Sequence, residues 1–160
     1  CFMNLFCFRL TLLLSFVLCF GACSFIDVFE KNATIPAEGW SRDYKPEISL
    51  EIRDTLSLYN IYAVLRHTER YKYNNIWLNV YVQFPGDSLK RQQLDLRLAT
   101  DDKGWLGSGM DDIYEHRIRI TREPQAFTKA GLYRFQLEQI MRDNPLEHVM
   151  NVGIRVEKAK

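Results

Sequence analysis

The side chain with the clearest chemical assignment in this sequence is the thiol of Cys23. It follows Arg9, the apolar run Leu10–Phe20 and the small residues Gly21 and Ala22. This order is typical of a secretory signal, because the apolar run is shorter than the roughly 20 residues that span a bilayer. A cysteine directly after the small residues is the residue that accepts diacylglycerol in bacterial lipoproteins. We therefore predict cleavage before Cys23 and attachment to a membrane through its acyl chains, with an uncleaved signal anchor or a soluble secreted form as alternatives.

The three histidines are the next candidates for chemistry. His67, His116 and His148 are widely separated and lack the short ligand spacing of a zinc site. We expect structural roles for them and no metal. His116 is in phase with Ile118 and Ile120, which predicts a partly buried, hydrogen-bonded imidazole.

Hydrolytic chemistry has little support. Ser57, His67 and Asp54 could be combined into a triad, but no Gly-x-Ser-x-Gly or other nucleophile motif surrounds any serine. We expect no catalytic residue, no enzymatic activity and no cofactor. The 21 basic and 20 acidic side chains nearly cancel, so no strong field would attract nucleic acid, and we expect none as a partner.

Two polar loops are candidates for binding a protein partner. The aspartate loop, residues 101–112, places four aspartates and three glycines around one tryptophan. It lacks the ligand order of a calcium loop and could be a wide hairpin, or a docking loop with the tryptophan as an exposed anchor. The tyrosine loop, residues 66–75, could likewise be a solvated connection or part of the same surface. The candidate contacts are Trp105, Asp101, Asp102, Asp111, Asp112, Arg66, Tyr71 and Tyr73.

A carbohydrate site is the alternative hypothesis. Trp77, Asn79, Tyr81 and Gln83 lie along one face of a predicted strand and combine stacking surface with hydrogen-bonding groups. The simpler interpretation is an amphipathic face that the N-terminal segment covers.

Alternation with a period of two dominates the chain after residue 46. Residues 132–141 also fit a helical face, but Gly131-x-Tyr133 resembles the tyrosine corner of immunoglobulin-type sandwiches, which favours a strand. We predict an all-β fold, a single antiparallel β-sandwich, immunoglobulin-like or jelly-roll, of about seven to eight strands. The predicted strands are 48–52, 58–65 as a central strand, 76–84, 94–98, 117–120, 132–141 and 150–156.

The expected organisation is a signal peptide (1–22), a lipidated tether and opening segment (23–45) and one β-sandwich domain (46–160). All four cysteines lie within the first 23 residues. After cleavage only Cys23 would remain, so stability must come from packing rather than from disulfides.

A series of different short motifs extends along nearly the whole chain after the tether begins. They are Val28–Asn32, Ile35–Pro36, Trp40, Asp54–Thr55, Tyr59–Tyr62, Leu65–Thr68, Tyr71, Tyr73, Asn75–Leu78, Gly104–Gly107, Gly109, Asp112–Ile113, Gly131-x-Tyr133, Gln139–Arg142 and Val152–Lys158. Together they resemble the GldH lipoproteins of the Bacteroidetes.

This resemblance implies a cell-envelope lipoprotein linked to gliding motility, without enzymatic activity. We expect envelope proteins as partners and no small-molecule ligand. Ser24, rather than Asp, follows the acylated cysteine and no acidic run comes next, so we expect the outer membrane, facing the periplasm.

Overall fold

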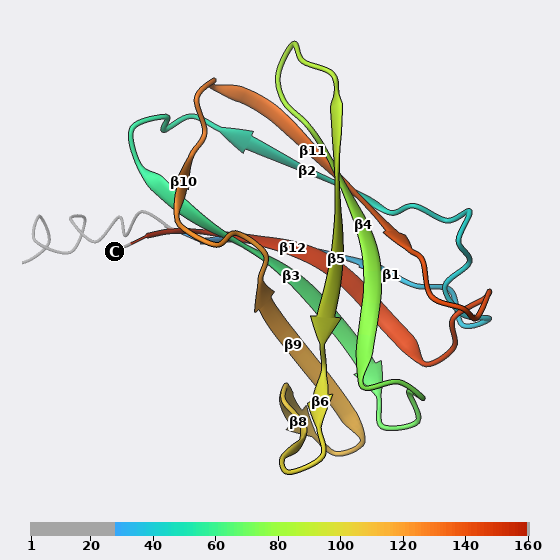
Figure 1. Cartoon of the computed structure of the whole chain (residues 1–160). Helices are drawn as coiled ribbons and strands as arrows, with labels where there is room; N and C mark the ends of the chain where they lie inside the picture. Colours follow the sequence, from blue (N-terminus) through green and yellow to red (C-terminus); the bar gives the residue numbers. More distant parts are fainter. Residues whose placement is uncertain (1–27, 160) are drawn as a thin grey trace, which may run out of the picture.

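The computed structural model describes residues 28–159, which form β-strands and connections without a helix (Figure 1). Residues 1–22 and Cys23 lie outside the described residues, so their predicted roles stay predictions. No helix in the described part is long and apolar enough to span a membrane. The strands are β1 (Val28–Thr34), β2 (Glu47–Ile52), β3 (Leu58–Thr68), β4 (Asn75–Gln83), β5 (Leu89–Arg97), β6 (Ala99–Thr100), β7 (Gly104–Trp105), β8 (Ser108–Met110), β9 (Ile113–Arg119), β10 (Gln125–Ala126), β11 (Gly131–Gln139) and β12 (Val149–Lys158).

Two antiparallel sheets carry the fold. One has the order β1-β12-β3-β9-β8, with β10 also paired to β3, and the other has the order β2-β11-β4-β5. β6 and β7 form a separate small hairpin. Figure 1 shows the second sheet lying across the first. The predicted all-β, sandwich-like fold is confirmed.

The core lies between the sheets and follows the predicted alternation. Ile48, Leu50 and Ile52 of β2 are buried, and the intervening side chains are not. β4 buries Ile76 and Leu78 in the same manner. β3 lies between β12 and β9, as expected for a central strand.

Residues 131–139 are a strand, as the tyrosine corner predicted. Gly131, the first residue of β11, has φ +133°, a conformation that residues with a side chain rarely adopt. Two residues later, the fully buried Tyr133 donates its hydroxyl hydrogen to the backbone oxygen of Lys129 over 2.8 Å. This bond fixes the turn into β11 against the core.

The segment before Pro46 belongs to the folded domain, which corrects the boundary expected at that residue. β1 pairs with β12 along its whole length. Ile35 and Trp40 are buried in the core, and Trp40 forms a β-bridge with Leu146. The period-two criterion missed β1 because burial does not alternate along it; the strand is defined by its backbone pairing with β12.

Candidate functional site

The two candidate loops converge at one end of the sandwich. The tyrosine loop begins at the end of β3 and the aspartate loop leads into β9, and these strands pair in antiparallel register down to Thr68 opposite Ile113. The backbone N–H of Glu69 also donates to the oxygen of Asp112 over 2.7 Å. The aspartate loop itself is not one wide hairpin, because β6–β7 and the β8–β9 turn divide it into two tight ones.

Beneath these loops lies a pair of histidines that sequence spacing did not reveal. His67 on β3 and His116 on β9 are 0% and 3% exposed, and their Nε2 atoms are 2.9 Å apart. The rings are stacked with centroids 5.0 Å apart. The predicted hydrogen bond of His116 is confirmed, and its side chain is more deeply buried than the partial burial expected. Its partner could not be inferred, because it comes from a strand 49 residues earlier in the sequence.

The hydrogen-bond partners assign the tautomers of this pair. Nδ1 of His67 lies 2.7 Å from the backbone oxygen of Thr68, which can only accept, so Nδ1 carries the hydrogen. In the neutral ring Nε2 of His67 is then an acceptor, and His116 donates its Nε2–H. Burial lowers the pKa of both imidazoles, that of His116 to about 4.

Trp105 packs over the histidine pair rather than standing exposed. Its ring centroid is 4.4 Å from that of His67 and 5.7 Å from that of Tyr114. The expectation that few side chains shield this tryptophan is therefore wrong. Gly107 allows the aspartate loop to approach the backbone of β9 closely, because a Cβ there would lie 2.5 Å from the backbone oxygen of Glu115.

The other predicted contacts divide into buried and exposed groups. Tyr71 is 4% exposed and donates to the backbone oxygen of Asn75 over 3.0 Å, and burial raises the pKa of its hydroxyl. Arg66 and Tyr73 are half-buried. Asp101, Asp102, Asp111 and Asp112 are exposed. The largest exposed apolar side chains of the aspartate loop are ones the sequence did not single out, Leu106 at 47% and Met110 at 74%.

The candidate carbohydrate residues are largely engaged within the protein. Asn79 Nδ2 and the Tyr81 hydroxyl donate to Oε2 of Glu138 over 2.9 and 2.6 Å. Lys45, from the segment before β2, lies 2.9 Å from Oε1 of Glu138. Burial opposes ionisation, but these bonds and the Lys45 ammonium hold the pKa of Glu138 at about 2. Trp77 and Gln83 remain at the two ends of this face, and the alternative hypothesis gains no support from the contacts.

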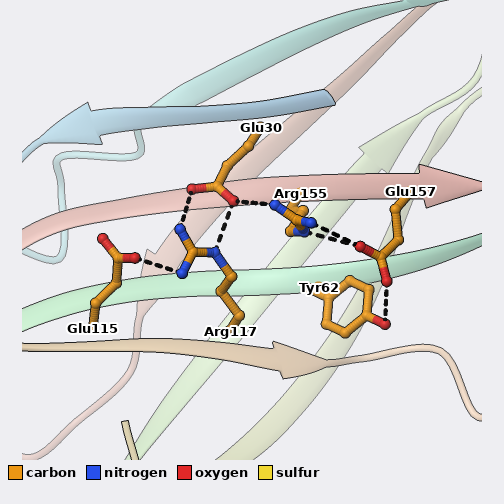
Figure 2. A network of polar contacts seen from close by, with 6 residues as sticks. All are labelled: Glu30, Tyr62, Glu115, Arg117, Arg155 and Glu157. Atoms are coloured by element: carbon orange, nitrogen blue, oxygen red, sulfur yellow. Dashed lines mark hydrogen bonds and ion pairs between the residues drawn. The ribbon is translucent and has the colours of Figure 1, made fainter. Parts of the chain in front are cut away.

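A second polar cluster, also unforeseen, lies on the outer face of the larger sheet (Figure 2). Arg117 reaches from β9 to Glu30 on β1 with a two-bond contact of 2.9 and 3.1 Å. Arg155 on β12 lies between, 3.0 Å from Glu30 and 2.9 Å from Glu157. The Arg117 hydrogen bond lowers the pKa of the Glu30 carboxyl. The cluster ties β1, the first described strand, to the centre of the sheet.

Comparison with known proteins decides the family. The sequence profile described as GldH lipoprotein matches residues 27–156. The chain belongs to the GldH lipoprotein family. The gliding motility lipoprotein GldH homolog of Christiangramia forsetii is 25% identical over 89% of this chain and 91% of its own length. The gliding motility lipoprotein GldH of Flavobacterium johnsoniae is 28% identical over 92% and 94%.

Among solved structures, the infectious bursal disease virus VP2 subviral particle aligns with 81% of this chain and 30% of its own chain. Its TM-score of 0.34 and 12% identity are too low to carry an argument. Within residues 28–159, no three His, Cys, Asp or Glu side chains are grouped so as to hold a metal ion.

Proposed function

We propose that this protein is a lipid-anchored component of the cell envelope that docks, without enzymatic activity, onto gliding motility or secretion machinery. The observation that carries the proposal is membership of the GldH family across residues 27–156, together with the similarity to two gliding motility lipoproteins. The acyl chains on Cys23 hold the domain at the membrane, and an envelope protein binds the far end of the sandwich.

The register of the larger sheet supports this division of roles. β1 starts at Val28 opposite Glu157, which lies opposite Asn60 near the start of β3. The candidate loops meet at the other end of β3, an 11-residue strand. At about 3.3 Å per residue, the two ends of this strand are roughly 30 Å apart. The loops therefore lie far from the point where the anchor segment joins the domain.

The exposed chemistry of the aspartate loop supports a protein partner. Leu106 and Met110 offer apolar contacts, and the four exposed aspartates of the same loop outnumber its one lysine, Lys103. Such a surface fits a partner with a small apolar pocket and a basic rim. Trp105, packed over His67, holds the loop in shape from beneath and contacts the partner only through its exposed edge.

The titratable groups favour a role without catalysis. The two buried histidines bond each other and Glu138 is held by Asn79, Tyr81 and Lys45, so these groups are occupied by internal contacts.

For location we propose the periplasmic face of the outer membrane, since Ser24 rather than Asp follows Cys23.

Crosslinking in cells tests the docking surface. The full chain, carrying both Leu106→Ala and Met110→Ala, would be compared with the wild type and with Leu56→Ala, which removes a 94% exposed leucine between β2 and β3. We expect the double variant to lose crosslinked envelope proteins that the Leu56 control retains. Equal recovery from all three would overturn the assignment of the loop.

A further inference from the structure

An apolar cleft of about 400 Å³ opens between the two sheets on the side where β5 faces β9 and β10. This volume falls within the roughly 300–1,000 Å³ of small-molecule sites. Its walls come from both sheets and from the connection between β9 and β10. The lining residues that matter here are Ile61, Val82, Phe84, Lys90, Ile120 and Arg122.

The side of β5 that faces the other sheet changes from apolar to polar at this cleft. Leu94 and Leu96 continue the core, opposite Leu78 and Ile76 of β4. Two and four residues before Leu94, in the same phase, the strand carries Gln92 and Lys90. A sandwich interior would place apolar side chains there to fill the space. At this end the sheets instead leave apolar walls with polar groups at the mouth.

The charge of the lining has one sign. Lys90, Arg91 and Arg122 are basic, and the lining includes no Asp or Glu. Within the described residues no carboxylate forms an ion pair with either arginine. Lys90 has one long, exposed contact of 3.8 Å with Asp87, and its ammonium lies 4.8 Å from the centre of the Phe84 ring. Such an exposed ion pair contributes little, so Lys90 and Arg122 remain available to an anion. Arg91 is out of phase with Lys90 and faces the other side of β5.

The cleft is also level with the start of the first strand. Ile61, in its wall, lies opposite Val156, which lies opposite Phe29. It therefore opens at the end of the sandwich where the anchor segment enters, remote from the aspartate loop.

We propose that this cleft binds a single-chain anionic lipid of the fatty-acid class. The acyl chain lies between the sheets against Val82, Phe84 and Ile120, which are only partly buried, and the carboxylate lies at the mouth, between Lys90 and Arg122. A neutral amphiphile would leave the cations unpaired, and a two-chain phospholipid would need more apolar volume than one cleft of this size provides. The site is independent of the docking surface.

Photolabelling of the full chain in isolated envelopes tests the site. No acyl donor is added to the reaction. The probe is palmitate with a diazirine in the middle of its chain, and the labelled peptides are mapped by mass spectrometry. We expect adducts on β4, β5 and residues 120–127, removed by excess palmitate and not by hexadecanol, which has the same chain length and no charge. Labelling elsewhere only, or equal competition by hexadecanol, would overturn the proposal. Stronger competition by phosphatidylglycerol vesicles than by palmitate would overturn the single-chain assignment.

Variants separate the two halves of the site. Lys90→Glu combined with Arg122→Glu should reduce labelling about tenfold, as expected for lost charge-assisted contacts. Lys103→Glu, an exposed lysine in the aspartate loop, is the matched control and should not. Val82→Trp should fill the cleft and abolish labelling without lowering the unfolding temperature. If that variant fails to fold, Ala126→Trp, at an exposed position of the lining, gives the same test. Retained labelling in the folded variant would contradict the site.

Discussion

His116 donates a hydrogen bond to His67 across 2.9 Å, and this contact joins β9 to β3 directly beneath the candidate docking loops. Trp105 covers the pair from the aspartate loop. The loop surface is therefore built on a buried, neutral imidazole pair whose protonation would place hydrogens on both facing nitrogens.

Stability should fall on mild acidification because of this pair. Burial lowers the pKa of both histidines from the ordinary value of 6.5, that of His116 to about 4. The unfolded chain therefore binds protons first, and the stabilisation is complete above pH 6.5 and is lost as the pH falls toward 4. We expect the free energy of unfolding to decrease by about 2 kcal/mol between pH 7 and 5. Chemical denaturation at a series of pH values measures it.

His116→Gln is the control for this pH dependence, because the amide can still donate to His67 and does not titrate. It should make the pH 7 to 5 profile shallower, leaving only the contribution of His67. The carboxylates with lowered pKa are Glu30, Asp54, Asp87 and Glu138, the last at about 2, and their contributions to the pH dependence of stability are lost only below about pH 4.5. An unchanged slope in the variant would show that the pair is not the cause.

Trp105→Ala should destabilise the domain. The ring packs against His67 and Tyr114, so its removal leaves a cavity over the histidine pair and should cost about 2 to 3 kcal/mol. Met110→Ala, at a 74% exposed position of the same loop, should change stability by less than about 0.5 kcal/mol. Thermal unfolding of both variants distinguishes them, and equal melting temperatures would mean that Trp105 does not contribute to the core.

Gly153→Ala should loosen β1. An added Cβ would overlap Oδ1 of Asn32 and lie 2.5 Å from the backbone oxygen of Lys31, so β1 must shift away from β12, at a cost of about 1 to 3 kcal/mol. We expect faster hydrogen exchange of the β1 amides. Met150→Ala, also on β12 but just outside its pairing with β1, is the control. Identical exchange in the two variants would refute this explanation of the glycine.

Cys23→Ala should accumulate as an unprocessed precursor, because the acylated cysteine is the residue that the processing peptidase requires in lipoproteins. Gly21-Ala22-Cys23 after the apolar run motivates the prediction. Mass measurement of the protein from wild-type and variant cells checks it. Normal cleavage with membrane retention of the variant would exclude lipidation at this residue.

Sequence patterns predicted what depends on local order. Alternation located the long strands from β2 onward, and the Gly131-x-Tyr133 pattern gave both the strand and its hydroxyl bond to Lys129. Features that depend on distant pairing were missed. β1 exists through its backbone bonds to β12, and the histidine pair forms only because β3 and β9 lie side by side.

Sequence patterns also could not predict which single side chains of a loop are exposed. Trp105 and Met110 lie five residues apart in one glycine-rich loop, yet the tryptophan turns onto the histidines while the methionine faces solvent. The tight hairpins β6–β7 and β8–β9 determine which of these two side chains is covered and which is exposed.

Site-specific photocrosslinking tests the docking claim most directly. A photoreactive amino acid would replace Met110 in the full chain, and in a second strain Leu56, which is equally apolar, 94% exposed and near the start of β3. Crosslinking in living cells should give discrete adducts with an envelope protein from position 110 and none of them from position 56. Absence of any discrete adduct at 110, or the same adducts from both positions, would contradict a docking surface at the aspartate loop.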